Sequence, residues 1–104
     1  MPRAAMVELV VEVRGPPFES EPAVREMRRA LEASVVSNVR LGMAVAQEFG
    51  RLCVTLRALV QSADLLDAAR LGAPALREVL TDTTARFAER GVRLDEVSLH
   101  TSWS

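Results

Sequence analysis

The segment PALREVLTDTTARFAERGVRLDEVSLHT, residues 74–101, decides the fold expected for this chain. In its first half, residues recur at the spacing of one helical face: Leu76, Val79, Leu80, Thr83 and Phe87. Pro74 suits the first turn of such a helix, where a missing N–H group costs nothing. Gly91 can take the left-handed conformation that commonly follows a helix end. A helix over residues 74–90 is therefore predicted.

A strand is predicted directly after that helix, because apolar and polar residues begin to alternate. The alternation holds at Val92 and Leu94 and resumes out of step at Val97. The skip at Asp95 and Glu96 predicts a β-bulge, in which one strand carries an extra residue. A helix that feeds directly into a strand is a β/α layer unit, so the preceding residues should supply the rest of its sheet.

Three earlier stretches alternate in the same way and are predicted strands: residues 7–13, 39–45 and 52–60. The link over residues 46–50 predicts a hairpin, with Gly50 available for a positive φ. The strand at 52–60 should be internal to the sheet. The strand at 7–13 is expected either at an edge or paired with a neighbouring chain, because edge strands are templates for pairing.

An amphipathic helix is expected from Pro22 to about Ser37 and Asn38, with Ser20 as its N-cap. Residues 63–70 are ambiguous. Their composition favours a helix, whereas their position between a strand and the Pro74 helix favours a fourth strand. The strand is preferred, partly on the family resemblance described below.

The predicted fold class is therefore α+β, a mostly antiparallel sheet with two helices packed on one face, in the order β-α-β-β-β-α-β. The 104 residues are enough for one domain. Residues 1–21 would form an N-terminal strand and linker, and residues 22–101 the α+β core.

Composition excludes several classes of protein. The net charge is −1, from 13 basic and 14 acidic residues, which argues against a general nucleic-acid or membrane-surface binder. All the basic residues are arginine, and they are scattered along the sequence. The single cysteine cannot form an internal disulfide or a zinc cluster and fits a reducing compartment. No apolar run is long enough to span a bilayer.

No constellation for catalysis, cofactor binding or metal binding stands out. His100 is the only histidine, and it is expected to be a surface residue of a strand. Cys53 has no evident base beside it and is expected to pack as a small apolar residue. Asp64 and Asp67 would point to opposite faces of a strand, so they would not make an acid–base pair. The chain is therefore expected to be a non-enzymatic binding module.

Five stretches together resemble the C-terminal domain of the flagellar hook-length control proteins and of the needle-length regulators of type III secretion. They are VRLGMAV at 39–45, QEFG at 47–50, LCVTL at 52–56, ALREVL at 75–80 and FAERGVRLDEVSL at 87–99. The resemblance covers residues 22–101. The sequence departs from the family pattern at Gln47 and Phe49, where the family has proline and leucine, and at 63–70, and residues 7–13 have no counterpart.

The resemblance implies a substrate-specificity switch that acts by binding and performs no covalent chemistry. Its partner would be the cytoplasmic domain of the switch component of the type III export apparatus, contacted in the bacterial cytoplasm or at the export gate. The contact would end export of needle or rod subunits and begin export of later substrates. The protein itself could be exported by the same apparatus. Family members carry a long N-terminal region that gauges length; with 21 residues before Pro22, this sequence would be a switch domain alone or a member without a ruler.

On this resemblance the partner-binding residues would be Gln47, Phe49, Gly50, Leu76 and Arg77. Phe49 would act as an apolar anchor and Arg77 would supply charge-assisted hydrogen bonds. The competing interpretation for each is structural: a turn for Gly50, core for Leu76, helix solvation for Arg77. At the level of function, two alternatives remain. One is a homo-oligomeric α+β scaffold that pairs chains through residues 7–13. The other is a small enzyme with a site formed between subunits.

Overall fold

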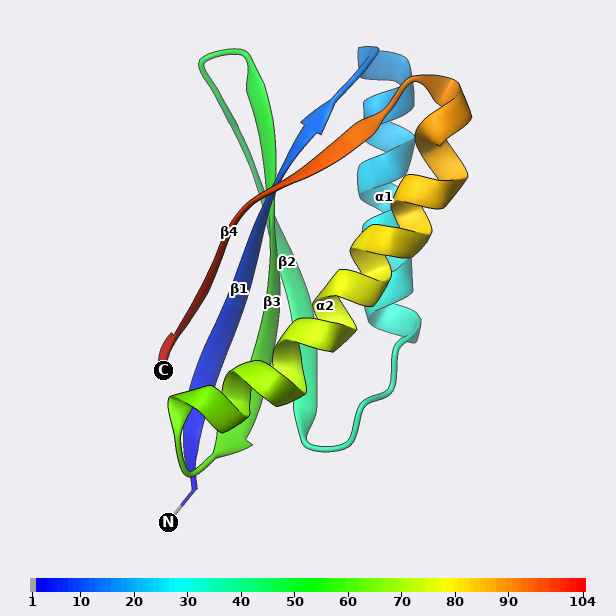
Figure 1. Ribbon diagram of the computed structural model, residues 1–104. Helices are drawn as coiled ribbons and strands as arrows, with labels where there is room; N and C mark the ends of the chain where they lie inside the picture. Colours follow the sequence, from blue (N-terminus) through cyan, green and yellow to red (C-terminus); the bar gives the residue numbers. More distant parts are fainter. Residues whose placement is uncertain (1) are drawn as a thin grey trace.

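Four strands form one antiparallel sheet, and two helices cover one of its faces (Figure 1). The computed structural model describes residues 2–104. The strands are β1 (Arg3–Arg14), β2 (Val39–Glu48), β3 (Arg51–Ser62) and β4 (Arg93–Trp103). The helices are α1 (Pro17–Ala33) and α2 (Leu65–Phe87), the latter extended by a 3₁₀ turn, η1 (Ala88–Arg90). The predicted α+β class, with an antiparallel sheet and two helices on one face, is confirmed.

The strands lie in the order β2-β3-β1-β4, and every neighbouring pair is antiparallel. With the element order β-α-β-β-α-β, this is the ferredoxin-like arrangement of two interleaved βαβ halves. The strand at 52–60 was expected to be internal, and β3 is internal. The strand at 7–13 was expected at an edge or paired with another chain, and this prediction is wrong. β1 lies between β3 and β4, so both of its edges are already hydrogen-bonded.

The fourth strand predicted over residues 63–70 does not exist, because α2 begins there. Asp64 is the N-cap, and its side chain accepts a hydrogen bond from the Asp67 N–H at 2.7 Å. The Ser62 hydroxyl lies 2.9 Å from the Asp67 carboxylate, which fixes the turn out of β3. An acidic N-cap with a second acid three residues on is a strong helix start. Pro74, predicted in the first turn, therefore lies inside a helix that begins at Leu65.

The first helix begins at Pro17 and ends at Ala33, earlier at both ends than the predicted 22 to 37–38. Residues 17–21 therefore belong to the helix and not to a linker. Pro17 occupies the first helical position, and the Pro16 carbonyl accepts hydrogen bonds from the Glu19 and Ser20 N–H groups. At the other end the Ser34 hydroxyl donates a hydrogen bond to the Ala30 carbonyl at 2.8 Å. Side-chain hydrogen bonds of this kind compete with the backbone hydrogen bonds that would continue the helix.

The end of the last helix and the strand that follows it agree with the prediction. Gly91 has φ +77°, the left-handed conformation predicted for it, and closes the 3₁₀ turn before β4. β4 contains the expected bulge, although its extra residue is Val97 and not the acidic pair before it. Val10 faces Ser98 while Val11 faces Glu96, which leaves Val97 without a partner.

The core lies between the sheet and the helices. Alternate residues of β1 and β3 point into it, and the larger ones are fully buried: Val7, Leu9, Val11, Val54, Leu56 and Val60. Met27 of α1 and Leu76 of α2 close it from the helical side. Burying one such side chain contributes about 1.5–3 kcal/mol. α2 approaches closely at Gly72, where an added Cβ would lie 2.9 Å from Cγ2 of Val7.

The start of β1 and the end of β4 lie side by side at one corner of the sheet (Figure 1). Ala5 faces Trp103 across β1 and β4, and the Ser104 N–H donates to the Ala4 carbonyl at 2.9 Å. The Arg3 guanidinium lies 4.6 Å from the centre of the Trp103 ring. Trp103 therefore packs over the end of the sheet, as cation–π contacts of this kind favour.

Candidate functional site

The turn between β2 and β3 holds the most exposed aromatic side chain among the described residues. Glu48 pairs with Arg51, so the turn consists of Phe49 and Gly50 alone and not of the five residues predicted. Both have positive φ, +51° and +74°, as a two-residue hairpin turn of type I′ requires. Glycine adopts this conformation freely, but a bulky side chain is strained in it. Phe49 is 99% exposed, so packing does not offset that strain.

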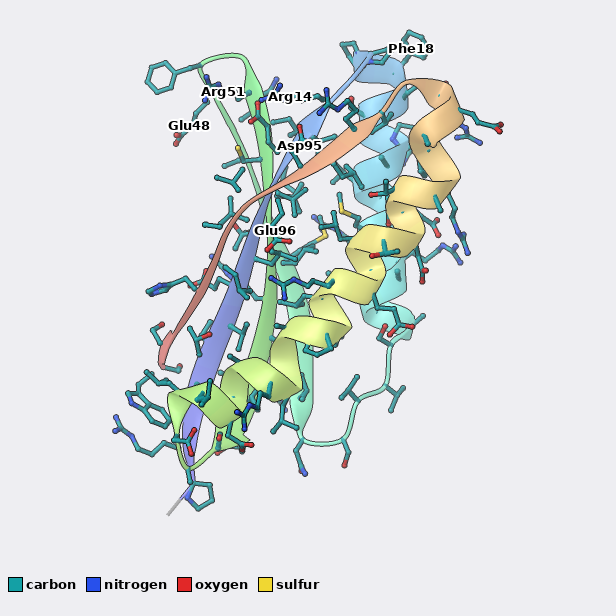
Figure 2. All side chains as sticks on the ribbon, viewed as in Figure 1. Arg14, Phe18, Glu48, Arg51, Asp95 and Glu96 are labelled. Atoms are coloured by element: carbon teal, nitrogen blue, oxygen red, sulfur yellow. The ribbon has the colours of Figure 1, made fainter. Side chains whose placement is uncertain are left out.

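A groove runs from this turn to the start of α1. We call it the hairpin groove; its volume is about 420 Å³. It is lined by Val13, Gly15, Pro17, Ser20, Glu21, Val24, Val45, Gln47, Gly50 and Leu52. Apolar side chains therefore make up much of its wall, with Gln47, Ser20 and Glu21 as polar points. In Figure 2 the labelled pair Glu48 and Arg51 lies at the tip of the hairpin, at the same end of the molecule as Phe18 of α1.

The five predicted contact residues do not form one surface. Gln47 and Gly50 line the hairpin groove, and Phe49 lies between them in the chain. Leu76 is fully buried in the core, so the prediction that it contacts a partner is wrong. Its neighbour Arg77 is exposed and donates to Glu96 of β4 at 2.9 Å. That contact raises the pKa of Arg77, chiefly through the hydrogen bond. β4 and β2 are the opposite edge strands of the sheet. Arg77 therefore lies at the β4 edge, and the hairpin lies at the β2 edge.

The remaining polar residues considered from the sequence are dispersed. His100 is exposed on β4 and faces Glu8 of β1, which is itself paired with Arg57 at 3.2 Å. Cys53 is a half-buried free thiol on β3. Within residues 2–104, no group of three or more histidine, cysteine or acidic side chains is placed to hold a metal ion. None of the helices in that range is both long and apolar enough to cross a membrane.

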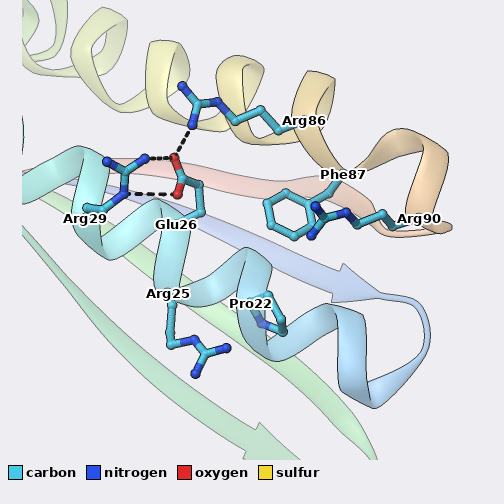
Figure 3. Close-up of a pocket in the computed structure, with 7 residues that line it drawn as sticks. All are labelled: Pro22, Arg25, Glu26, Arg29, Arg86, Phe87 and Arg90. Carbon is cyan, nitrogen blue, oxygen red and sulfur yellow. Dashed lines mark hydrogen bonds and ion pairs between the residues drawn. The ribbon is translucent and has the colours of Figure 1, made fainter.

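A second hollow, between α1 and the end of α2, is lined mainly by arginines (Figure 3). We call it the arginine cleft; its volume is about 590 Å³. Its lining residues are Pro22, Arg25, Glu26, Arg29, Arg86, Phe87 and Arg90. From the sequence the arginines were expected to be scattered, so this cluster was not predicted. A signal was present, because Arg25 and Arg29, and likewise Arg86 and Arg90, stand four residues apart on a helix and so share a face.

Glu26 is the centre of the arginine cleft. Its carboxylate accepts two hydrogen bonds from Arg29, from Nη2 at 2.6 Å and from Nε at 3.1 Å. The same oxygen that receives Nη2 also accepts from Nη1 of Arg86 at 2.6 Å. The Arg29 hydrogen bond is the main cause that lowers the pKa of Glu26; burial opposes it, and the charges of Arg29 and Arg86 add to it. One carboxylate thus holds two guanidinium groups from different helices.

Arg90 is positioned by an aromatic ring and not by a hydrogen bond. Its guanidinium carbon lies 4.8 Å from the centre of the Phe87 ring, and its nearest carboxylate oxygen, from Glu19, is 3.7 Å away. Phe87 is only 6% exposed and provides a fixed platform. Arg25 lies on the same helix as Glu26 but points away from it in Figure 3. The N–H groups of Arg90 are therefore largely free to bind an additional anion.

No family model and no curated protein matches this chain. Among solved structures, the chain is similar to the "De novo designed protein Foldit4". The two share 7% of their residues at a TM-score of 0.51, with 96% of this chain and 97% of that chain covered. At that identity the likeness concerns only the fold.

Proposed function

We propose that this protein is a non-catalytic binding module that binds a partner protein at the hairpin groove. The observation that carries the proposal is Phe49, a strained and 99% exposed phenylalanine in the turn of the hairpin whose residues Gln47 and Gly50 line the hairpin groove. Strain that packing does not require is often kept for function. Aromatic anchors beside a pocket are the residues that most often dominate binding energy at interfaces.

The partner proposed is the cytoplasmic domain of the type III export switch component, and the proposed action is the change from early to late export substrates. The support is the sequence resemblance over residues 75–80 and 87–99 and the turn at 47–50. The proposed place of action is the bacterial cytoplasm at the export gate. The contact surface is narrower than the resemblance implied, because it leaves out the buried Leu76 and centres on Gln47, Phe49 and Gly50.

The test is a calorimetric titration of the protein with that purified domain from the same genome. Phe49→Ala should weaken binding at least about tenfold, or ~1.4 kcal/mol. Val35→Ala is the matched control, because Val35 is 97% exposed in the loop after α1 and lies outside the groove. Arg77→Ala tests the other side of the molecule and should leave the affinity within about twofold. No saturable binding at ~100 μM, or equal losses in all three variants, would count against the proposal.

A second candidate is a homo-oligomer that pairs through a sheet edge, since β4 is an edge strand with exposed apolar side chains. Val97 is 59% exposed and Leu99 is 36% exposed. β1 cannot serve this purpose, because both of its edges are occupied. Light scattering decides between the candidates: a stable dimer that becomes monomeric in Val97→Lys with Leu99→Lys would favour the oligomer, since edge lysines block strand pairing.

A further inference from the structure

We infer that the arginine cleft is a binding site for a compact, multiply charged phosphate anion of the di- or triphosphate type. It is separate from the hairpin groove, which uses a different face of α1 and shares no lining residue with it. The cleft is lined by four arginines and one glutamate in a chain whose net charge is −1. That concentration of positive charge is the first argument for an anionic ligand.

The donors are the second argument. A guanidinium carries five N–H groups in a planar fork that matches the oxygens of a phosphate. Arg29 uses two of its groups on Glu26, and Arg86 uses one. Nη1 of Arg90 lies 3.7 Å from the Glu19 carboxylate, and the face of its guanidinium group stacks on the Phe87 ring. Most of the N–H groups on these three side chains are therefore available to a ligand.

The arrangement is the third argument, because the donors are held before a ligand arrives. Glu26 joins Arg29 of α1 to Arg86 of α2 through a single oxygen, which brings two like charges close together (Figure 3). Phe87, the last residue of α2, contacts Arg90 in the η1 turn that follows. A preorganised site loses less conformational entropy on binding than three independent arginines would. The volume of about 590 Å³ is in the range of small-molecule sites.

The choice of phosphate follows from the walls of the cleft. Apart from Phe87 and Pro22, the lining is charged, so an apolar ligand would gain little contact there. Glu26 already occupies the centre with one negative charge. A ligand must therefore carry several charges in a small volume to compete for the outer donors, as a di- or triphosphate does.

The experiment titrates the whole chain by calorimetry at ~50 mM salt, where exposed charges are not fully screened. The probes are inorganic tripolyphosphate, ATP and a hexaglutamate peptide. Tripolyphosphate should bind saturably. If ATP binds more tightly than tripolyphosphate, the source is a nucleotide; if both bind equally, it is the phosphate chain alone. A hexaglutamate peptide that binds more tightly than either would overturn the phosphate assignment, and no binding of either phosphate probe would overturn the site.

Two pairs of variants locate the site. Arg86→Ala should weaken tripolyphosphate binding by about tenfold, as loss of a charge-assisted donor predicts. Arg28→Ala removes the same charge from α1 outside the cleft and should change the affinity less than about twofold. Equal losses in both would show general attraction and overturn the proposal. Arg86→Gln provides a second measurement if Arg86→Ala does not fold.

The second pair tests whether the ligand shares the arginines that Glu26 holds. Glu26→Gln removes the competing negative charge, while its amide oxygen can still accept the hydrogen bonds that hold Arg29 and Arg86 in place. It should therefore tighten tripolyphosphate binding by about threefold or more. Glu32→Gln makes the same change in charge on an exposed part of α1, outside the cleft, and should have little effect. If Glu26→Gln leaves the affinity unchanged or lowers it, the anion does not bind at these guanidinium groups.

Discussion

Arg86 of α2 donates a 2.6 Å hydrogen bond to Glu26 of α1, across 60 residues of sequence. Because Glu26 also binds Arg29 of its own helix, a single carboxylate joins the two helices above the core. The contact is local in space and remote in sequence, so it forms only when both helices are packed on the sheet. It therefore couples the packing of the helices to the ionisation of one side chain.

The first prediction concerns pH. The pKa of Glu26 in the folded protein is lowered from its ordinary 4.5, mainly by the Arg29 hydrogen bond. Below 4.5 the unfolded chain therefore binds this proton more readily than the folded one, so stability falls as the pH falls through the lower, folded pKa. Urea unfolding midpoints of the wild type and Glu26→Gln should differ above about pH 5 and converge as the pH falls below the folded pKa of Glu26. A constant difference between the two over that range would contradict the assignment.

The second prediction concerns Phe49. Replacing it by asparagine gives Asn-Gly, the pair best suited to a type I′ turn. Relief of the positive φ strain should raise the free energy of unfolding by about 1 kcal/mol. The same variant should lose affinity for the proposed partner protein, as is expected for Phe49→Ala. A thermal melt and a titration on one sample measure both effects, and a drop in stability would show that the turn is not strained.

The third prediction concerns the contact of α2 with the sheet. Gly72→Ala should destabilise the protein by about 1–3 kcal/mol despite the better helix propensity of alanine. The reason is that the new Cβ would lie 2.9 Å from Val7 Cγ2 and 3.2 Å from the Ala58 Cβ. Gly42→Ala on β2 is the control, since nothing lies within 4 Å of a Cβ there. Chemical denaturation of both variants gives the comparison, and equal stabilities would mean that α2 can shift at no cost.

The fourth prediction concerns Thr83, which is 1% exposed and faces the core from α2. Within residues 2–104 its hydroxyl oxygen is the buried side-chain polar atom that lacks a hydrogen-bond partner. Thr83→Val keeps the shape and removes the unpaired group, so it should stabilise the protein by about 1 kcal/mol. Thr84→Val serves as the reverse case, because the Thr84 hydroxyl donates to the Leu80 carbonyl at 2.8 Å. A loss of stability in Thr83→Val would indicate a partner for that hydroxyl.

The sequence was sufficient to predict the α+β class, all four strands and the stop at Gly91, since these depend on local periodicity and on one left-handed residue. The strand predicted over residues 63–70 was wrong because their position in the chain and the family resemblance were preferred to their composition, which favours a helix. Asp64 and Asp67 also carry the spacing of a helix cap. The start of α1 was also predicted too late. The helix was expected to begin at Pro22, whereas Pro17 occupies its first position.

The candidate sites also differ in how far the sequence could predict them. Gln47, Phe49 and Gly50 could be placed together because they are adjacent in a tight turn. Leu76 and Arg77 are consecutive, yet Leu76 points into the core and Arg77 points toward β4. Adjacency in the sequence therefore does not place two helical residues on the same surface. The arginine cleft needs Arg29 of one helix and Arg86 of another. Their approach depends on how the helices pack side by side, and periodicity within either helix does not determine that.

The pairing of β1 with β4 brings Ala4 and Ser104 together, since the Ser104 N–H donates to the Ala4 carbonyl at 2.9 Å. A short peptide that links residues 4 and 104 would therefore not have to move either strand. New ends could then be opened in the exposed loop between α1 and β2. A circularly permuted chain should then reach the same sheet order, with a different element made first.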